Sequence, residues 1–168
     1  MPRRSRRAEQ RGFAALVVSL VLACAATVRA DLSGSVTARG LFGLDGRYGG
    51  GLMADLWATR GRVRPGAAFG IGALAKGDDA SSRVVTPLAF SLGLMPRDER
   101  SSVLGVLRLG GYAGAEKGGF IAGGFGGATI AYRFALGEGA SLMLGADGWG
   151  LLGKRGGVFL GPLLGLGF

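Results

Sequence analysis

The feature of this sequence that most restricts its fold is the spacing of its glycines. From Leu32 onward, most stretches of helical length contain several glycine residues. Each glycine inside a helix costs about 1 kcal/mol relative to alanine, because its backbone loses more conformational freedom on ordering. The chain, which has 35 glycines among 168 residues, is therefore expected to form strands rather than long helices.

The apolar residues of the same region recur at a period of two. Between Val63 and Lys76 the odd-numbered positions form an apolar face, while Arg64, Lys76 and several glycines fall on the other face. Residues 83–94 and 158–168 alternate in the same way. Because successive side chains of a strand point to opposite faces, the pattern predicts strands with two different faces. Eight segments of roughly ten to fourteen residues can be placed, the length of a tilted strand that crosses a membrane.

The distribution of bulk between the two faces indicates the kind of barrel. The charge-free face is large and aliphatic, whereas the charged face is dominated by glycine and alanine. A soluble ligand-binding barrel would have large apolar residues inside and charges outside. The sequence therefore predicts an apolar exterior and an interior of small and polar residues. A closed ring of eight strands also satisfies every backbone hydrogen bond in a bilayer, so the expected fold is an all-β, eight-stranded antiparallel transmembrane β-barrel.

The breaks between these segments predict short connections. With both ends of the barrel in the periplasm, periplasmic turns are expected at residues 60–62, 96–102 and 136–140. Outer loops are expected near residues 45–46, 77–82, 116–119 and 153–157. Loops this short disfavour an adhesin, because binding surfaces on such barrels normally need longer extracellular insertions.

The first thirty residues predict an exported protein. A basic stretch to Arg11 precedes an apolar run from Phe13 to Ala26, and Val28-Arg29-Ala30 precedes Asp31. This order is typical of a signal peptide, with small or apolar residues three and one places before the cleavage site. We expect a signal peptide over residues 1–30 and a barrel domain over residues 31–168. Cys24 follows Val21-Leu22-Ala23, which resembles a lipobox, so a second interpretation is a lipoprotein lipidated at Cys24.

The residue types present argue against several functions. Histidine is absent and Cys24 is the single cysteine, so neither a Ser-His-Asp triad nor a histidine-bound zinc site can form. We expect no catalytic residues, no metal, no cofactor and no enzymatic activity. The net charge of +9 arises largely near the N-terminus, and residues 31–168 hold 14 basic and 10 acidic residues without a basic cluster. Nucleic acid is therefore not an expected partner.

The same register turns four charged residues toward the lumen at similar heights, namely Arg39, Asp55, Arg108 and Asp147. Three aromatic residues, Trp57, Tyr112 and Trp149, also face inward. Unpaired buried charge is costly, so the arginines and aspartates are expected to pair and, with the aromatics, to plug the lumen.

Outward-facing aromatic residues fall near the two ends of the predicted strands. Tyr132, Phe134 and Phe168 lie toward the periplasmic end, and Phe42, Tyr48 and Phe120 lie toward the outer end. Two such girdles are typical of a barrel that crosses a membrane. On these patterns the chain resembles the small eight-stranded outer-membrane β-barrel family of Gram-negative bacteria.

The end of the chain extends this resemblance. Leu164, Leu166 and the closing Phe168 are similar to the C-terminal signal by which the barrel-assembly machinery recognises its clients. The resemblance implies an outer-membrane location, contact with outer-membrane lipid, and assembly by that machinery.

Three functional classes fit the sequence. The favoured one is a structural or surface-interaction barrel of the outer membrane with a plugged lumen. The second is a narrow passive channel, in which Arg39 and Arg108 would line a continuous water path. The third is a glycine-rich outer-membrane lipoprotein anchored through Cys24, in which the alternation would be incidental to packing.

Overall fold

The computed structural model describes residues 32–59, 61–77, 79–95, 101–153 and 156–168. The predicted signal peptide and Cys24 lie outside these residues, so cleavage and lipidation stay predictions. No helix in the described part of the chain is long and apolar enough to cross a membrane.

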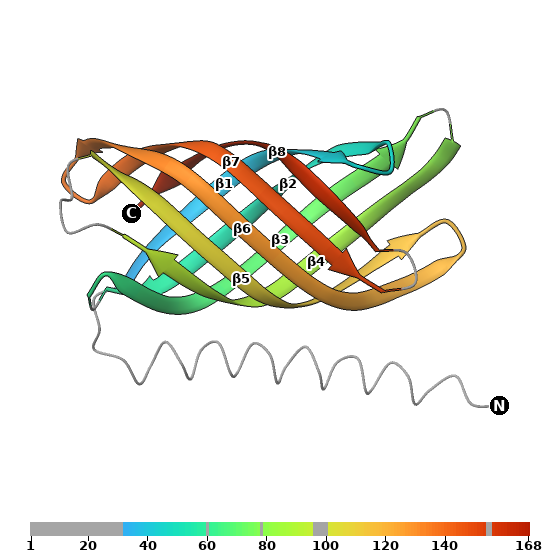
Figure 1. Cartoon of the computed structure of the whole chain (residues 1–168), viewed down its shortest axis with the longest axis horizontal. Helices are drawn as coiled ribbons and strands as arrows, with labels where there is room; N and C mark the ends of the chain where they lie inside the picture. The colour runs from blue at the N-terminus through green and yellow to red at the C-terminus, as the bar shows by residue number, and fades with distance from the viewer. Residues whose placement is uncertain (1–31, 60, 78, 96–100, 154–155) are drawn as a thin grey trace. The chain divides into compact units, whose positions relative to one another are not determined.

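Eight antiparallel strands follow one another in chain order and form a closed barrel (Figure 1). They are β1 (Leu32–Gly43), β2 (Arg47–Ala58), β3 (Val63–Lys76), β4 (Asp79–Leu94), β5 (Ser101–Glu116), β6 (Gly119–Gly137), β7 (Ala140–Leu152) and β8 (Gly157–Gly167). Each strand pairs with its neighbours in the sequence, and β8 pairs with β1 to complete the ring. The predicted eight-stranded all-β fold is confirmed.

The predicted segment lengths are too short for three strands. β4 and β5 have 16 residues each and β6 has 19, compared with the predicted ten to fourteen. The predicted loop at residues 77–82 is correspondingly too long, because β4 already begins at Asp79. Gly77 and Gly139 adopt positive φ angles of 42° and 75°, and this conformation lets the chain reverse tightly. The polar residues 79–82, which were expected in a loop, therefore belong to strand β4.

The register around the barrel determines its width. Following paired residues from Gly167 of β8 through Ser35 of β1 and onward to Leu151 of β7 leads back to β8 at Gly157, ten residues from the start. For eight strands, this shift corresponds to a tilt of about 40° from the barrel axis. A barrel of this size has an interior just wide enough for side chains to fill.

The interior is bulkier and more apolar than predicted. Large buried side chains line it, including Leu41, Met53, Leu74, Leu104, Phe125, Met143, Leu151, Phe159 and Leu163. The expectation of a mainly small and polar interior with three aromatic residues therefore missed these large apolar side chains. The inward-facing glycines instead leave room for these neighbours: a Cβ on Gly72 would lie 3.0 Å from the Trp149 ring, and one on Gly93 would lie 3.2 Å from Trp57 Nε1. Small and large residues thus complement each other across the lumen.

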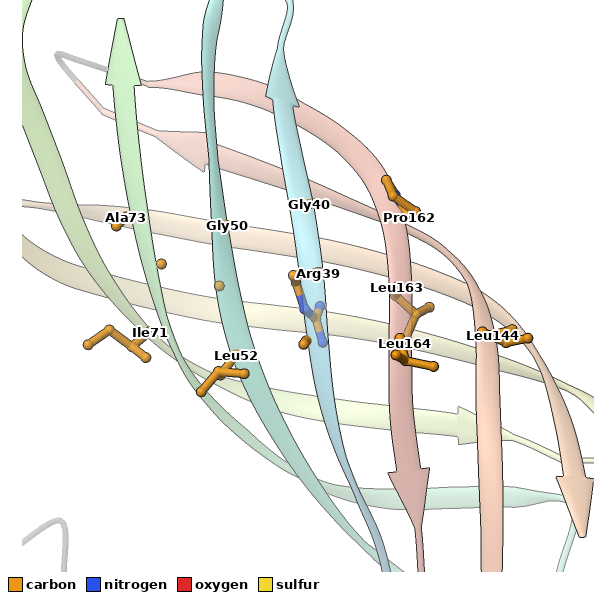
Figure 2. Close-up of a pocket in the computed structure, with 13 residues that line it drawn as sticks. Arg39, Gly40, Gly50, Leu52, Ile71, Ala73, Leu144, Pro162, Leu163 and Leu164 are labelled. Atoms are coloured by element: carbon orange, nitrogen blue, oxygen red, sulfur yellow. The ribbon is translucent and has the colours of Figure 1, made fainter. Parts of the chain in front are cut away.

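The exterior is apolar around the whole ring. Exposed large apolar side chains occur on every strand, for example Val36, Leu52, Phe69, Phe90 and Leu107. Figure 2 shows one exterior region, where Gly40, Gly50 and Ala73 lie among larger side chains. The small residues leave a shallow apolar hollow of about 760 Å³ there. Exposed apolar surface of this extent marks an interaction with a membrane or another apolar surface.

Candidate functional site

The four predicted inward-facing charges meet in one layer of the lumen. Arg108 of β5 donates Nε–H to Asp55 Oδ1 at 2.8 Å and Nη2–H to Asp55 Oδ2 at 2.7 Å. Its Nη1 donates to Thr129 Oγ1 at 2.7 Å and to Asp147 Oδ1 at 3.2 Å. The pair with Asp55 is bidentate, which is the strongest geometry for an arginine and a carboxylate. Arg108 therefore joins β5 to β2, β6 and β7 across the lumen.

Arg39 of β1 holds the other side of the layer. Its guanidinium pairs with Asp147 Oδ2 and donates to the hydroxyl of Thr37. Its Cζ also lies 5.5 Å from the ring centroid of Trp149, within the range of a cation–π interaction. Asp147 additionally accepts a hydrogen bond from the Thr129 hydroxyl. We call Arg39, Asp55, Arg108 and Asp147 the ionic quartet; its formal charges sum to zero.

Apolar layers lie on both sides of the ionic quartet. All four residues are at most 4% exposed. On the side of the β1–β2 turn lies the buried cluster around Trp149, Phe125 and Phe159. On the side of the β2–β3 turn lies a second buried cluster, which includes Trp57, Leu104 and Met143. The quartet is thus enclosed in a medium of low polarity, where its pairing matters most.

The predicted lumen aromatics have two partners that sequence reasoning missed. Trp57, Tyr112 and Trp149 all point inward and are buried. Phe125 meets Trp149 edge to face at 5.4 Å between ring centroids, and Phe159 is the cross-strand neighbour of Trp149. Both phenylalanines lie at inward positions of the alternation, and this signal could have identified them.

A second group of charges, at the end of the barrel that carries the β1–β2 turn, was also missed. Arg47 contacts Asp45 at 2.6 Å and Glu116 at 3.7 Å, and Arg83 contacts Glu116 at 3.3 Å. Arg83 and Glu116 are directly opposed in the β4–β5 register. The predicted loop at residues 77–82 placed Arg83 at the very edge of its strand, which hid this pairing. The group joins the β1–β2 hairpin to β4 and β5 above the apolar layer.

The predicted girdle residues all lie on the exterior. Phe42, Tyr48, Phe120, Tyr132, Phe134 and Phe168 are exposed outward. Tyr132 and Phe134 contact each other with ring centroids 4.7 Å apart. Among the described residues, no group of three or more His, Cys, Asp or Glu side chains is placed to hold a metal ion.

The C-terminal residues close the ring. Leu164, Leu166 and Phe168 all point outward from the last strand and its end. Phe168 exchanges backbone hydrogen bonds of 2.8 and 2.9 Å with Gly34 at the start of β1. A Cβ on Gly34 would lie 2.9 Å from the Phe168 ring, so this ring covers the seam between the first and last strands.

We expect Phe168→Ser to lower the amount of folded barrel in the membrane several-fold. The change removes the terminal aromatic ring but keeps the backbone that pairs with Gly34. The measurement is the folded fraction in isolated membranes, read from the mobility of unheated protein on a denaturing gel. Phe42→Ser, which removes an exposed ring far from the terminus, is the control. Equal folded amounts for Phe168→Ser and the unchanged protein would contradict the assembly-signal assignment.

Comparison with known proteins identifies the fold. No protein-family model and no curated protein matches the sequence. Among solved structures, the N-terminal β-barrel domain of Pseudomonas aeruginosa OprF aligns with a TM-score of 0.50 and 14% identity, over 81% of this chain and 97% of that domain. Neisserial surface protein A (NspA) aligns with a TM-score of 0.56 and 10% identity, over 81% of this chain and 94% of that protein. The chain therefore has the fold of the small eight-stranded outer-membrane β-barrels.

Proposed function

We propose that this protein is a β-barrel of the Gram-negative outer membrane with a structural or surface-interaction role, no enzymatic activity and a lumen that does not conduct ions. Its apolar exterior fits lipid, and its two aromatic girdles fit the two interfaces of a bilayer. The predicted signal peptide supplies export, and the C-terminal residues supply the signal for the barrel-assembly machinery.

The proposal of a closed lumen is supported by the order in which apolar and charged layers follow one another along the barrel axis. Each charge of the ionic quartet has an oppositely charged partner, and apolar clusters lie against the quartet on both sides. An ion crossing the lumen would have to pass two apolar layers and disrupt buried ion pairs. Both steps are costly, since an ion in an apolar layer loses its hydration and a separated buried pair leaves uncompensated charge.

The test is conductance of the purified protein in planar lipid bilayers. The folded state is first established by a difference in gel mobility between unheated and boiled protein and by a β-rich circular dichroism spectrum. We expect no single-channel steps above the bilayer baseline, because two apolar clusters and the paired ionic quartet lie along the lumen. Continuous, uniform conductance steps from protein shown to be folded would overturn the closed lumen and establish the narrow channel instead.

A further inference from the structure

Two borders between neighbouring strands contain a break in the pairing, well inside the strands. On the β8–β1 border the pairing stops at Gly40–Leu41, opposite Gly161–Pro162, and it resumes on either side. On the β3–β4 border it stops at Gly70–Ile71, opposite Thr86–Pro87, and it also resumes. The register is the same before and after each break, so no residue is inserted there. By contrast, β5 and β6 pair without interruption along their shared border.

The first break has a chemical cause in Pro162. At the end of the same border, Gly34 and Phe168 exchange two backbone hydrogen bonds of 2.8 and 2.9 Å. In an antiparallel pair this arrangement recurs at every second residue, so the register places Gly40 and Pro162 at such a position. Proline has no backbone N–H, and the carbonyl of Gly40 therefore lacks the donor that the ladder would otherwise supply.

Pro87 causes the second break in the same way. The Met95 N–H donates to the Arg62 carbonyl at 2.9 Å, and the ladder repeats that bond at every second residue along this border. The residue that faces Gly70 in this series is Pro87, which has no N–H to donate. Each of the two borders therefore lacks one ladder hydrogen bond, and in a bilayer no water would replace it.

The two breaks enclose one contiguous part of the wall. β1, β2 and β3 are neighbours in the ring, with β8 on one side of them and β4 on the other. One break lies on each of these two sides. We call the three strands β1, β2 and β3 the panel. Local opening of a structure starts where few bonds hold a unit to its surroundings, so the panel borders are the places where this wall separates most readily.

The ionic quartet joins the panel to the rest of the barrel. Arg39 of the panel pairs with Asp147 of β7, and Asp55 of the panel pairs with Arg108 of β5. Both contacts cross the lumen and connect a panel strand to a strand outside the panel. Arg39 also directly precedes Gly40, so its contact lies beside the first break.

The exterior hollow lies over the first break. Gly40 and Pro162, on the two sides of the break, both line the hollow, and Figure 2 shows them on neighbouring strands. Gly50, which pairs with Gly40 on β2, also lines it, and neither glycine has a side chain to cover the border. Behind the same border lies Leu41, which is completely buried in the cluster around Trp149. At this break, a single layer of backbone separates the hollow from that cluster.

We propose that the panel opens locally along its two broken borders and that the ionic quartet is the latch that holds it closed. The missing ladder bonds lower the cost of separating the borders. The latch raises that cost, because separating a buried ion pair leaves uncompensated charge. Opening at Gly40 and Pro162 joins the exterior hollow to the buried cluster around Trp149. This opening runs through the wall rather than along the barrel axis, so it does not require a lumen that conducts ions.

Amide hydrogen exchange of isotope-labelled, folded protein in detergent micelles tests the weakness of the borders. We expect the amides of Gly40, Phe42, Gly70 and Gly72, which flank the breaks, to exchange at least about tenfold faster than amides of the β5–β6 border. The comparison uses rates corrected for the intrinsic exchange of each residue type, at similar distances from the strand ends.

Two proline variants test the cause of the break. Pro162→Ala supplies an N–H opposite the Gly40 carbonyl and should slow the exchange of Gly40 and Phe42 about three- to tenfold, the usual effect of one hydrogen bond. Pro65→Ala is the matched control. It changes a proline near the start of β3, outside both breaks, and should leave these rates unchanged.

The double variant Arg108→Leu/Asp55→Leu tests the latch. It removes one of the two contacts between the panel and the rest of the barrel and leaves no unpaired charge at Asp55. We expect the amides beside the two breaks to exchange at least about fivefold faster, relative to those of the β5–β6 border. A contribution to overall stability alone would accelerate all slowly exchanging amides by the same factor.

Three results would overturn the proposal. Equal corrected rates at the breaks and along the β5–β6 border would mean that the missing bonds do not weaken the panel borders. Unchanged exchange in Pro162→Ala would mean that the Gly40 carbonyl does not lack a donor. Uniform acceleration in the double variant would mean that the quartet stabilises the whole barrel and is not a latch. Because these measurements use folded protein in detergent, they do not depend on conductance, and the proposed function stands or fails separately.

Discussion

Replacing Arg108 with leucine is expected to lower the free energy of unfolding by about 3–5 kcal/mol, the usual cost of removing one partner from a buried ion pair. Arg108 makes four hydrogen bonds, two of them to Asp55. Asp147 keeps its contact with Arg39, but Asp55 loses its only ion pair among the described residues. The measurement is equilibrium unfolding in urea of the protein in detergent micelles or bilayers, followed by tryptophan fluorescence.

The double variant Arg108→Leu/Asp55→Leu separates the charge from the loss of a side chain. Replacing both members of a buried pair with apolar residues of similar size is often neutral, so we expect the double variant to recover most of the lost stability. Arg47→Leu is the second control: Arg47 lies beside the β1–β2 turn with a partly exposed side chain, where an ion pair contributes about 0–1 kcal/mol. Equal losses for Arg108→Leu and Arg47→Leu would contradict the central place of the quartet.

Replacing Trp149 with alanine is expected to cost about 3–5 kcal/mol, as for other large aromatic residues removed from a core. Trp149 is almost completely buried, packs edge to face on Phe125, and lies beneath the Arg39 guanidinium. Its removal leaves a cavity on the side of the quartet nearer the β1–β2 turn, and Gly72, which faces the Trp149 ring, has no side chain to fill that cavity. The same unfolding experiment measures the loss.

Leu44→Ala is the control for Trp149→Ala. Leu44 is 81% exposed in the turn between β1 and β2, so its truncation should change stability by no more than about 0.5 kcal/mol. If Trp149→Ala lowered the free energy of unfolding by no more than Leu44→Ala, the cluster around Trp149, Phe125 and Phe159 would not be a packed core. Because the inner cluster around Trp57 stays intact, we expect Trp149→Ala alone to leave the lumen closed to ions.

The period of two determined much of this protein without any structure. It indicated eight strands, the outward direction of both aromatic girdles, and the inward direction of Arg39, Asp55, Arg108 and Asp147. This succeeds because the side a strand residue faces depends only on whether its position is odd or even. The glycines at the turns and the absence of long helical segments further indicated an all-β fold.

The tertiary structure alone decided how residues on one face meet across the lumen. The distance of each residue from the end of its strand predicted similar heights for the four charges, but which of them pair depends on strand tilt, which the ten-residue shift on closure determines. That shift brings Arg108 of β5 opposite Asp55 of β2 across the lumen. The order of charged and apolar layers inside the barrel therefore follows from the register and closure of all eight strands, a non-local property that no single segment of the sequence encodes.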